Sequence, residues 1–257
     1  IITGTVSDGN IKVKKGTTGV VLVLQDLDLT STTGAAISIN KEASAKIIIS
    51  GTVTLTDAED PTDEDSADAE TADAYDGAAL KVKANASAYL TGSGTLNING
   101  TAKNGIKGGD DACLIIDGLN LNIAAVNDAI NANYDLTILS GTITIYAGDD
   151  ALHADHILTI GSEDGSGPVI NIISCAEGLE GTVVNILGGD ISITASDDAV
   201  NAANKYEGQL TPSLNQLGGN VTLTSQGDGY DSNGNINLIA GSASIPSRMN
   251  GGEAGID

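Results

Sequence analysis

The chain has 257 residues, with 34 acidic against 11 basic side chains and a formal net charge of −23. This balance disfavours nucleic acids and anionic membranes as partners, because phosphate-rich surfaces are held by clustered Lys and Arg. It suits a soluble extracellular protein or a protein that binds cations. The chain contains 33 Gly but no Phe and no Trp, so a sandwich or barrel core filled by large aromatic residues is not expected.

Four stretches follow one another along the chain. Residues 1–56 carry short β-rich segments that we expect to form the first coils of a repeating fold. Residues 57–76 contain ten acidic residues and almost no large apolar side chains, which predicts a solvated excursion from one coil. The strand pattern resumes over 77–103. After the central repeats, the rhythm is interrupted over 204–217, where we expect a second excursion.

A repeated unit dominates residues 104–235. Each copy has a small or acidic pair, a Gly or Ala and one apolar marker residue, followed by alternating β-branched residues. The markers, about 21 to 30 residues apart, are Ile106, Ile130, Leu152, Leu179, Val200 and Tyr230. A short apolar alternation advances in step with them and opens at Asp26, Gly51, Gly94, Gly118, Gly141, Gly167, Gly189, Gly219 and Gly241.

Two signals that advance together at this spacing are typical of a solenoid. One coil cannot bury its own apolar side, so stacked coils must share one continuous core. No segment shows sustained helical periodicity, and no run is long and apolar enough to cross a membrane, so membrane insertion is not expected. We therefore predict an all-β fold in which residues 1–257 form a single parallel β-helix domain of about nine coils of 21–30 residues.

Ionisable side chains recur at two positions of the repeat. Equal positions of stacked coils lie about 4.8 Å apart, and two carboxylates at that distance repel by about 3.5 kcal/mol at an effective dielectric near 20. A column of acids is therefore hard to keep ionised without cations between its rungs. The position two before the marker reads Asn104, Asp128, Asp150, Glu177, Asp198 and Asp228, and the position after it reads Lys107, Asn131, His153, Glu180, Asn201 and Asp231.

Calcium is the cation that these side chains favour, because it accepts about six to eight oxygen ligands in flexible geometry. Zinc is disfavoured, since His153 and His156 are three residues apart on a strand and no Cys pair is suitably spaced. The alternative is structural, because Asp and Asn recur at solenoid corners where they bond the backbone. The expected calcium ligands are Asp128, Asp149, Asp150, Asp155, Glu177, Glu180, Asp198, Asn201, Asp228 and Asp231.

The units GDDALHAD, AEGLEG and SDDAVNAAN, spaced by G-x-I-x-I strands, resemble a bacterial carbohydrate-binding β-helix family. That family occurs in cellulolytic anaerobes, binds cellulose and acidic sugars, and is similar in fold to polysaccharide lyases. The resemblance implies a right-handed β-helix that is secreted or attached to the cell surface, holds more than one calcium ion and recognises pectin-like uronates. It carries the calcium role to Asp149, Asp150, Asp155, Glu177, Glu180, Asp198 and Asp228.

The function we expect is calcium-dependent, non-catalytic binding of plant cell-wall polysaccharide by a monomeric protein. The acidic protein surface would repel acidic sugars such as polygalacturonate. Calcium bound between the protein carboxylates and the sugar carboxylates would turn this repulsion into attraction. A calcium-dependent polysaccharide lyase is the alternative, with Lys107 as the candidate base. A structural or adhesive solenoid stabilised by calcium is a third reading of the same residues.

The remaining residues with chemical potential are few. Cys113 and Cys175 lie about two coils apart, or roughly 10 Å along the axis, which is too far for a disulfide. We expect both to be buried as small hydrophobic residues. Without Trp, stacking on a sugar is limited to tyrosines, of which Tyr134 and Tyr146 lie in mid-chain.

Overall fold

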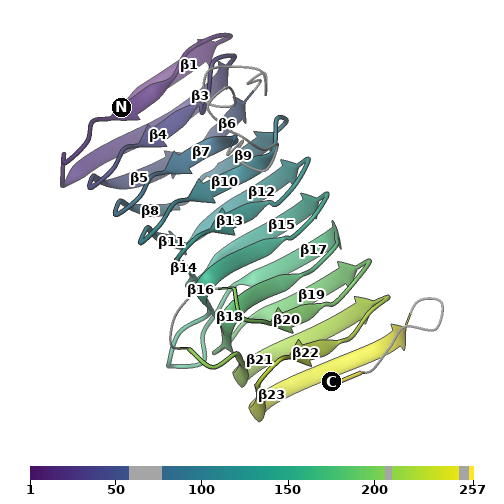
Figure 1. Ribbon diagram of the computed structural model, residues 1–257. Helices are drawn as coiled ribbons and strands as arrows, with labels where there is room; N and C mark the ends of the chain where they lie inside the picture. The colour runs from purple at the N-terminus through teal and green to yellow at the C-terminus, as the bar shows by residue number, and fades with distance from the viewer. Residues whose placement is uncertain (58–76, 206–209, 249–254) are drawn as a thin grey trace, which may run out of the picture.

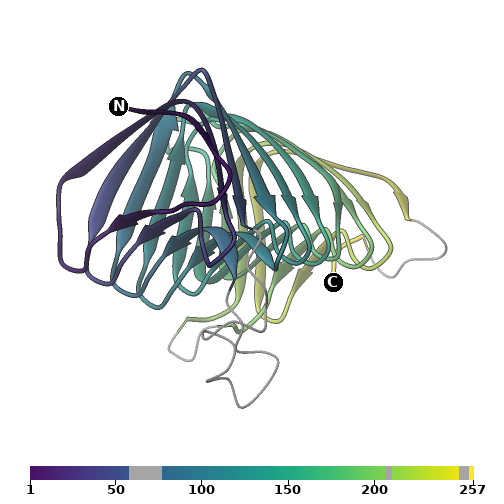
Figure 2. The same ribbon diagram turned by 90° about the horizontal axis from the view of Figure 1, so that it is seen from above.

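The computed structural model describes residues 1–57, 77–205, 210–248 and 255–257, which form an all-β parallel solenoid (Figure 1). No helix occurs in these ranges, so none is present that could cross a membrane. The termini lie at opposite ends of the stack (Figure 1), and Figure 2 shows the successive coils around a common interior. The fold class predicted from the repeats is confirmed.

Each coil contributes strands to three faces, which are defined by the parallel pairings between successive coils. Face 1 carries the marker residues and consists of β2 (Ile11–Val13), β4 (Ile37–Ile39), β7 (Ala78–Val82), β10 (Asn104–Gly108), β13 (Ile130–Ala132), the first parts of β16 (Leu152–Ile160) and β18 (Leu179–Ile186), β20 (Val200–Ala202) and β22 (Tyr230–Ser232). Its nine strands are separated by eight turns, close to the nine coils expected.

The other two faces complete each coil. Face 2 consists of the first part of β3 (Val20–Ser31), β5 (Ser44–Ser50), β8 (Ser87–Gly92), β11 (Cys113–Asp117), β14 (Asp135–Ile138), the second parts of β16 and β18, and the first parts of β21 (Ser213–Ser225) and β23 (Asn235–Arg248). Face 3 consists of β1 (Ile2–Val6), the second part of β3, β6 (Thr52–Asp57), β9 (Thr95–Gly100), β12 (Leu119–Ala125), β15 (Gly141–Ala147), β17 (Val169–Cys175), β19 (Asp190–Ala195) and the second parts of β21 and β23.

The marker residues stack in one column of face 1, as the repeats predict. Ile106 pairs with Ile130, and the column continues through each predicted marker to Tyr230. The column is longer than the sequence pattern indicated, because it starts at Ile11 and an isolated parallel bridge joins Tyr230 to Ile256. The segment ending at Asp257 therefore repeats the start of a further coil in the same register.

Face 3 carries the apolar alternation that the second sequence signal marked. Its inward residues form a column that includes Ile123, Ile145 and Ile172. The residue that opens each strand turns the corner, and Gly141 does so with φ 114°, in the left-handed region where a side chain is strained. A Cβ at Gly141 would also lie 2.4 Å from the carbonyl oxygen of Leu119 in the previous coil. Both the backbone conformation and the close approach thus favour glycine at position 141.

The core consists of stacked Ile, Leu, Val and Ala, in agreement with the absence of Phe and Trp from the sequence. Tyr230 is the exception, since it is fully buried and its hydroxyl donates a hydrogen bond to Oε1 of Gln216 at 2.8 Å. Burial raises the pKa of this phenol well above its ordinary value. Gln216 therefore provides the hydrogen-bond acceptor that the buried hydroxyl of Tyr230 needs inside the coil.

Both predicted excursions begin or end elsewhere than expected. Asp57 is the buried last residue of β6 and accepts hydrogen bonds from the amides of Thr101 and Ala102 at 2.7 and 3.2 Å, so it belongs to a coil. The rest of that excursion, 58–76, lies outside the described residues. Residues 213–217 of the second excursion belong to β21, where Leu214 pairs with Val184. Polar residues around Leu214 conceal this strand in the sequence.

The two cysteines are free, as expected. Cys175 is buried, and burial raises the pKa of its thiol to about 12. Cys113 is only half-buried on β11, so the expectation of full burial is wrong for this residue.

Candidate functional site

The two predicted columns of polar residues occupy face 1 in the expected register. His153 pairs with Asn131 on one side and Glu180 on the other, and the column ends with the pair formed by Asn201 and Asp231. The residues two positions before the markers stack alongside, through backbone hydrogen bonds from each coil to the next. The sequence repeats therefore predicted which ionisable side chains lie above one another.

Part of the column that precedes the markers has a structural role. Oδ1 of Asn104 accepts a hydrogen bond from the backbone amide of Asp128 at 3.2 Å, and Oδ1 of Asp128 does the same for Asp150. Oδ1 of Asp198 accepts from the amide of Asp228 at 2.5 Å. Each side chain thus satisfies an amide one coil further on, which is the structural alternative named for these positions.

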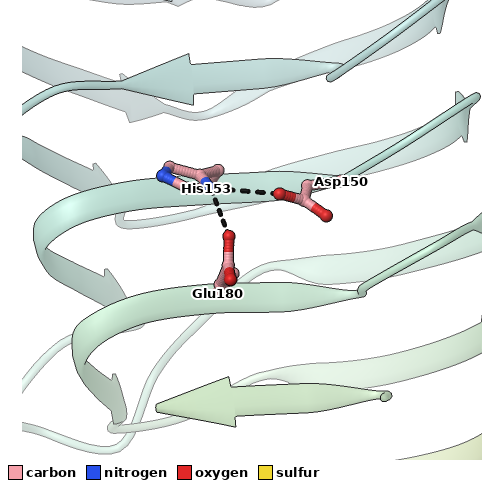
Figure 3. Close-up of side chains that lie close together, drawn as sticks. All are labelled: Asp150, His153 and Glu180. Atoms are coloured by element: carbon pink, nitrogen blue, oxygen red, sulfur yellow. Dashed lines mark hydrogen bonds and ion pairs between the residues drawn. The ribbon is translucent and has the colours of Figure 1, made fainter. Parts of the chain in front are cut away.

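An ionic cluster surrounds His153 in the middle of face 1 (Figure 3). Nδ1 of His153 lies 3.0 Å from Oδ2 of Asp150 and in ion-pair contact with Oε2 of Glu180 in the next coil, while Nε2 lies 2.7 Å from Oδ1 of Asp155. The ammonium of Lys205 lies 2.5 Å from the other oxygen of Glu180. We call these five residues the His153 cluster.

The charges in this cluster compensate one another. Burial alone would lower the pKa of His153, but the hydrogen bonds that its ring donates to the carboxylates of Asp150, Asp155 and Glu180 outweigh burial and raise the pKa to about 11. Burial likewise opposes ionisation of Glu180, yet the His153 imidazolium holds the pKa of Glu180 well below its usual range. Burial raises the pKa of Asp150 to about 7. Two internal cations therefore neutralise acids that the sequence assigned to calcium.

The middle of face 1 holds several largely buried polar side chains. The side chain of Glu180 is 2% exposed and Asn201 is 8% exposed. Lys205 pairs with Glu180, and sequence reasoning missed it because an excursion was expected over 204–217. The signal available in the sequence was a lysine, Lys205, placed soon after the repeats that carry Glu180 and Asn201. The more exposed side chains of the His153 cluster are Asp155 at 31% and Lys205 at 36%.

A second group of acids lies at the C-terminal end of the face. Carboxylate oxygens of Asp228, Asp231 and Asp257 all lie within 4.8 Å of one another. Asp198 lines the same open polar hollow, which has a volume of about 480 Å³. Burial raises the pKa of Asp198 to about 6. Among the described residues that line the hollow there is no Lys, Arg or His, in contrast to the His153 cluster. We call these four residues the terminal acid cluster.

Asn201 and Glu177 lie between the two clusters, and Asn201 is incompletely satisfied. Nδ2 of Asn201 donates to Oε2 of Glu177 at 3.1 Å, but Oδ1 of Asn201 is buried and has no hydrogen-bond partner among the described residues. Burial, with the nearby charge of Glu180, raises the pKa of Glu177 to about 8. A buried acceptor without a donor costs free energy, so this oxygen is suited to a cation or a water.

The remaining predicted residues lie apart from these contacts. Asp149 is exposed at the turn before β16. Nζ of Lys107 donates to Oδ1 of Asn131 and of Asn133, at 2.5 and 2.6 Å. The side chain of Lys107 is therefore engaged with two amide oxygens in the next coil.

His156 and Tyr134 form a separate contact. Their rings stack with centroids 4.3 Å apart and planes within 6°, and Nδ1 of His156 lies 2.6 Å from Oδ1 of Asp135. One face of Tyr134 is thus covered by protein, which leaves less of it for stacking on a sugar. Tyr146 is 52% exposed.

The fold and the columns define a parallel β-solenoid with ionisable side chains stacked along one face. Residues 1–254 match the family of carbohydrate-binding domain-containing proteins, and the chain belongs to that family. A solved structure of the polysaccharide lyase-like protein from C. thermocellum, a gadolinium derivative, is similar with a TM-score of 0.62 and 27% identity, covering 93% of this chain and 85% of that one. No curated protein matches the chain. These similarities support carbohydrate binding as the function.

Proposed function

We propose that the protein binds acidic plant cell-wall polysaccharide without cleaving it, at the bacterial surface, through calcium held on face 1. Polygalacturonate-like chains are the primary ligand and cellulose is a second one. The observation that carries the proposal is the convergence of three carboxylates in the terminal acid cluster, on an open hollow of a carbohydrate-binding solenoid.

Charge is the main argument for calcium. The protein carries a formal net charge of −23, and a polyuronate carries a carboxylate on every sugar, so direct contact between them is repulsive. A divalent cation between the two sets of carboxylates converts that repulsion into attraction. The cation would supply this bridging charge, and the protein residues would hold it in place.

The terminal acid cluster fits calcium better than the His153 cluster does. Asp198, Asp228, Asp231 and Asp257 offer only oxygen ligands, which a hard cation prefers. The buried Oδ1 of Asn201, one coil before Asp231, is a further oxygen that lacks a donor. In the His153 cluster a cation would compete with a bound proton and with Lys205. We therefore assign the calcium that contacts sugar to the terminal acid cluster.

The similar solenoid from C. thermocellum gives further support. Its solved structure is a gadolinium derivative. Gadolinium is a hard cation with the preference of calcium for oxygen ligands. Cation binding to a related solenoid is thus in keeping with the proposal.

The position of Lys107 favours binding over lyase chemistry. Five strand pairings separate β10 from β22, so Lys107 lies about 24 Å along the axis from Asp231. A base must lie within hydrogen-bond reach of the proton that it removes. Lys107 is too far from the terminal acid cluster to deprotonate a sugar held there by calcium.

The test is titration of polygalacturonate and of cellulose into the protein, in calcium and in chelator, with absorbance monitored for unsaturated products. We expect calcium-dependent binding of polygalacturonate and no product. Formation of product would show a lyase instead. Absence of binding in both buffers, with a melting temperature that still rises with calcium, would leave a structural solenoid.

A further inference from the structure

The lysines of this acidic protein are gathered at one end. All except Lys205 lie within residues 1–107, and face 1 of the first coils carries most of them. The column that holds Glu180 and Asp231 further along the stack is occupied by lysine at its beginning. Its first four members are Lys12, Ser38, Lys81 and Lys107.

A second lysine column runs beside the first. Lys14 follows β2 and Lys83 follows β7, each two residues beyond a lysine of the first column. Backbone hydrogen bonds from Asn40 to Val13 and from Lys83 to Ile39 keep these positions in register. Alternate residues of a strand point the same way, and Val13 and Val82 point into the core, so these lysines point outward.

The result is an array of cations that we call the lysine patch: Lys12, Lys14, Lys81, Lys83 and Lys107, the last of which also donates to the amide oxygens of Asn131 and Asn133. Neighbouring members are separated by about 7 Å along a strand and by about 5 or 10 Å along the axis. Lys12, Lys14 and Lys83 are exposed. The charged groups at the adjoining corner are Lys15, which pairs with Glu42 at 3.5 Å, Lys41, Asp110 and Asp111.

We infer that the lysine patch is a second glycan-binding site, which pairs directly with the carboxylates of an acidic polysaccharide and requires no calcium. The inference rests on the proposed function and adds a different chemistry at the opposite end of the same face. Repulsion from distant acids is weak at this site, because charges more than about 8–10 Å apart are screened at physiological ionic strength. The local sign of the surface therefore decides what binds there.

A regular polyanion fits this array better than a single small anion does. Each lysine supplies only a weak, screened ion pair at the surface, so useful affinity needs several pairs made by one molecule. Membership of a carbohydrate-binding family favours a glycan over nucleic acid. A polymer along face 1 would thus pair with lysine at the N-terminal end and with calcium at the C-terminal end.

The test measures polygalacturonate binding in chelator at low ionic strength, for the wild type, Lys14→Glu, Lys83→Glu and the double variant. Lys46→Glu is the matched control, because Lys46 is an exposed lysine on β5 of face 2 and the substitution changes the net charge equally. We expect each single variant to weaken binding about threefold and the double variant about tenfold, with little change in the control. Binding should also fall as salt rises.

The outcomes separate this inference from the proposed function. If polygalacturonate binds in calcium but not in chelator, the lysine patch is not a binding site and the calcium site is unaffected. The same conclusion follows if the patch variants and the Lys46→Glu control lose equal affinity in chelator. Chelator-resistant binding that only the patch variants lose would support it. Equally tight binding of single-stranded DNA would overturn its assignment to glycan. Dextran sulfate distinguishes a general affinity for anions from one for carboxylates, and tighter binding of it would overturn the carboxylate assignment.

Discussion

The ammonium of Lys205 lies 2.5 Å from Oε1 of Glu180, a side chain that is only 2% exposed. Together with His153 on the other oxygen of Glu180, it supplies internally the positive charge that an acidic column needs. The chain therefore supplies its own positive charge in the middle of face 1. Among the described residues that line the hollow of the terminal acid cluster there is no Lys, Arg or His, and we propose that calcium supplies the positive charge there.

Removal of the ammonium should destabilise the protein. Lys205→Met leaves the buried carboxylate of Glu180 with His153 as its remaining cation. Because Lys205 is about one third exposed, we expect a modest loss of about 1 kcal/mol in the free energy of unfolding. Urea denaturation at neutral pH measures it, with exposed Lys14→Met as the control. Equal midpoints for the two variants would show that the ion pair contributes nothing.

Stability in chelator should decline as pH rises. The pKa of His153 is raised from about 6.5 to about 11 on folding, so its contribution is complete below pH 6.5 and is lost as pH rises towards 11. Asp150 and Glu177, with pKa values raised to about 7 and about 8, bind protons more tightly when folded, which also lowers stability as pH rises from about 4 to 8.

The matching experiment is a series of melting curves from pH 5 to pH 10, for the wild type and His153→Gln. We expect the wild-type melting temperature to fall throughout this range, and His153→Gln to reduce the fall above pH 7. A wild-type melting temperature that rises with pH in chelator would contradict the assigned protonation of the His153 cluster.

Asp128 should be required for stability rather than for ligand binding. Its Oδ1 accepts a hydrogen bond from the backbone amide of Asp150, and the residue is 3% exposed. Asp128→Ala leaves that amide without a partner and should cost about 1–3 kcal/mol. Asp128→Asn keeps an acceptor and should cost less. Chemical denaturation separates the two variants, and similar losses in both would indicate that the carboxylate charge matters instead.

Calcium should raise the melting temperature through the terminal acid cluster. A ligand that binds only the folded state stabilises it by RT ln(1 + [L]/Kd), or about 2.7 kcal/mol at a hundredfold excess over Kd. Asp231→Asn should abolish most of this increase. Glu163→Gln, which removes an exposed acid outside face 1, is the control and should keep it. An unchanged calcium response in Asp231→Asn would place the cation elsewhere.

The sequence predicted the register of strands between coils better than it predicted the surroundings of individual side chains. Spacing alone placed Ile106, Ile130 and Leu152 in one column, because a solenoid converts a repeat into a stack. It did not reveal that Ile256 starts a further copy, since only two residues of that copy's strand region are present after Gly255. Nor did it show that Lys205 folds back onto Glu180, which depends on the path of a non-repetitive segment.

The lysines illustrate the same limit at the other end of the chain. The net charge of −23 hides a local excess of cations, because composition averages over surfaces that stacking separates. Lys12 and Lys81 lie 69 residues apart in the numbering, and only the pairings of β2 with β4 and of β4 with β7 bring them into one column. The acidic stretch between β6 and β7 broke the spacing that would otherwise have revealed the earlier copies.

We propose that calcium on the terminal acid cluster holds an acidic polysaccharide. The most direct measurement is the affinity of wild type and Asp231→Asn for polygalacturonate in saturating calcium, at an ionic strength that suppresses direct pairing with lysine. We predict at least about a tenfold weaker affinity for Asp231→Asn, with Glu163→Gln unchanged, since loss of one carboxylate ligand weakens both the binding of the cation and its bridge to the sugar. Equal affinities of wild type and Asp231→Asn would contradict it.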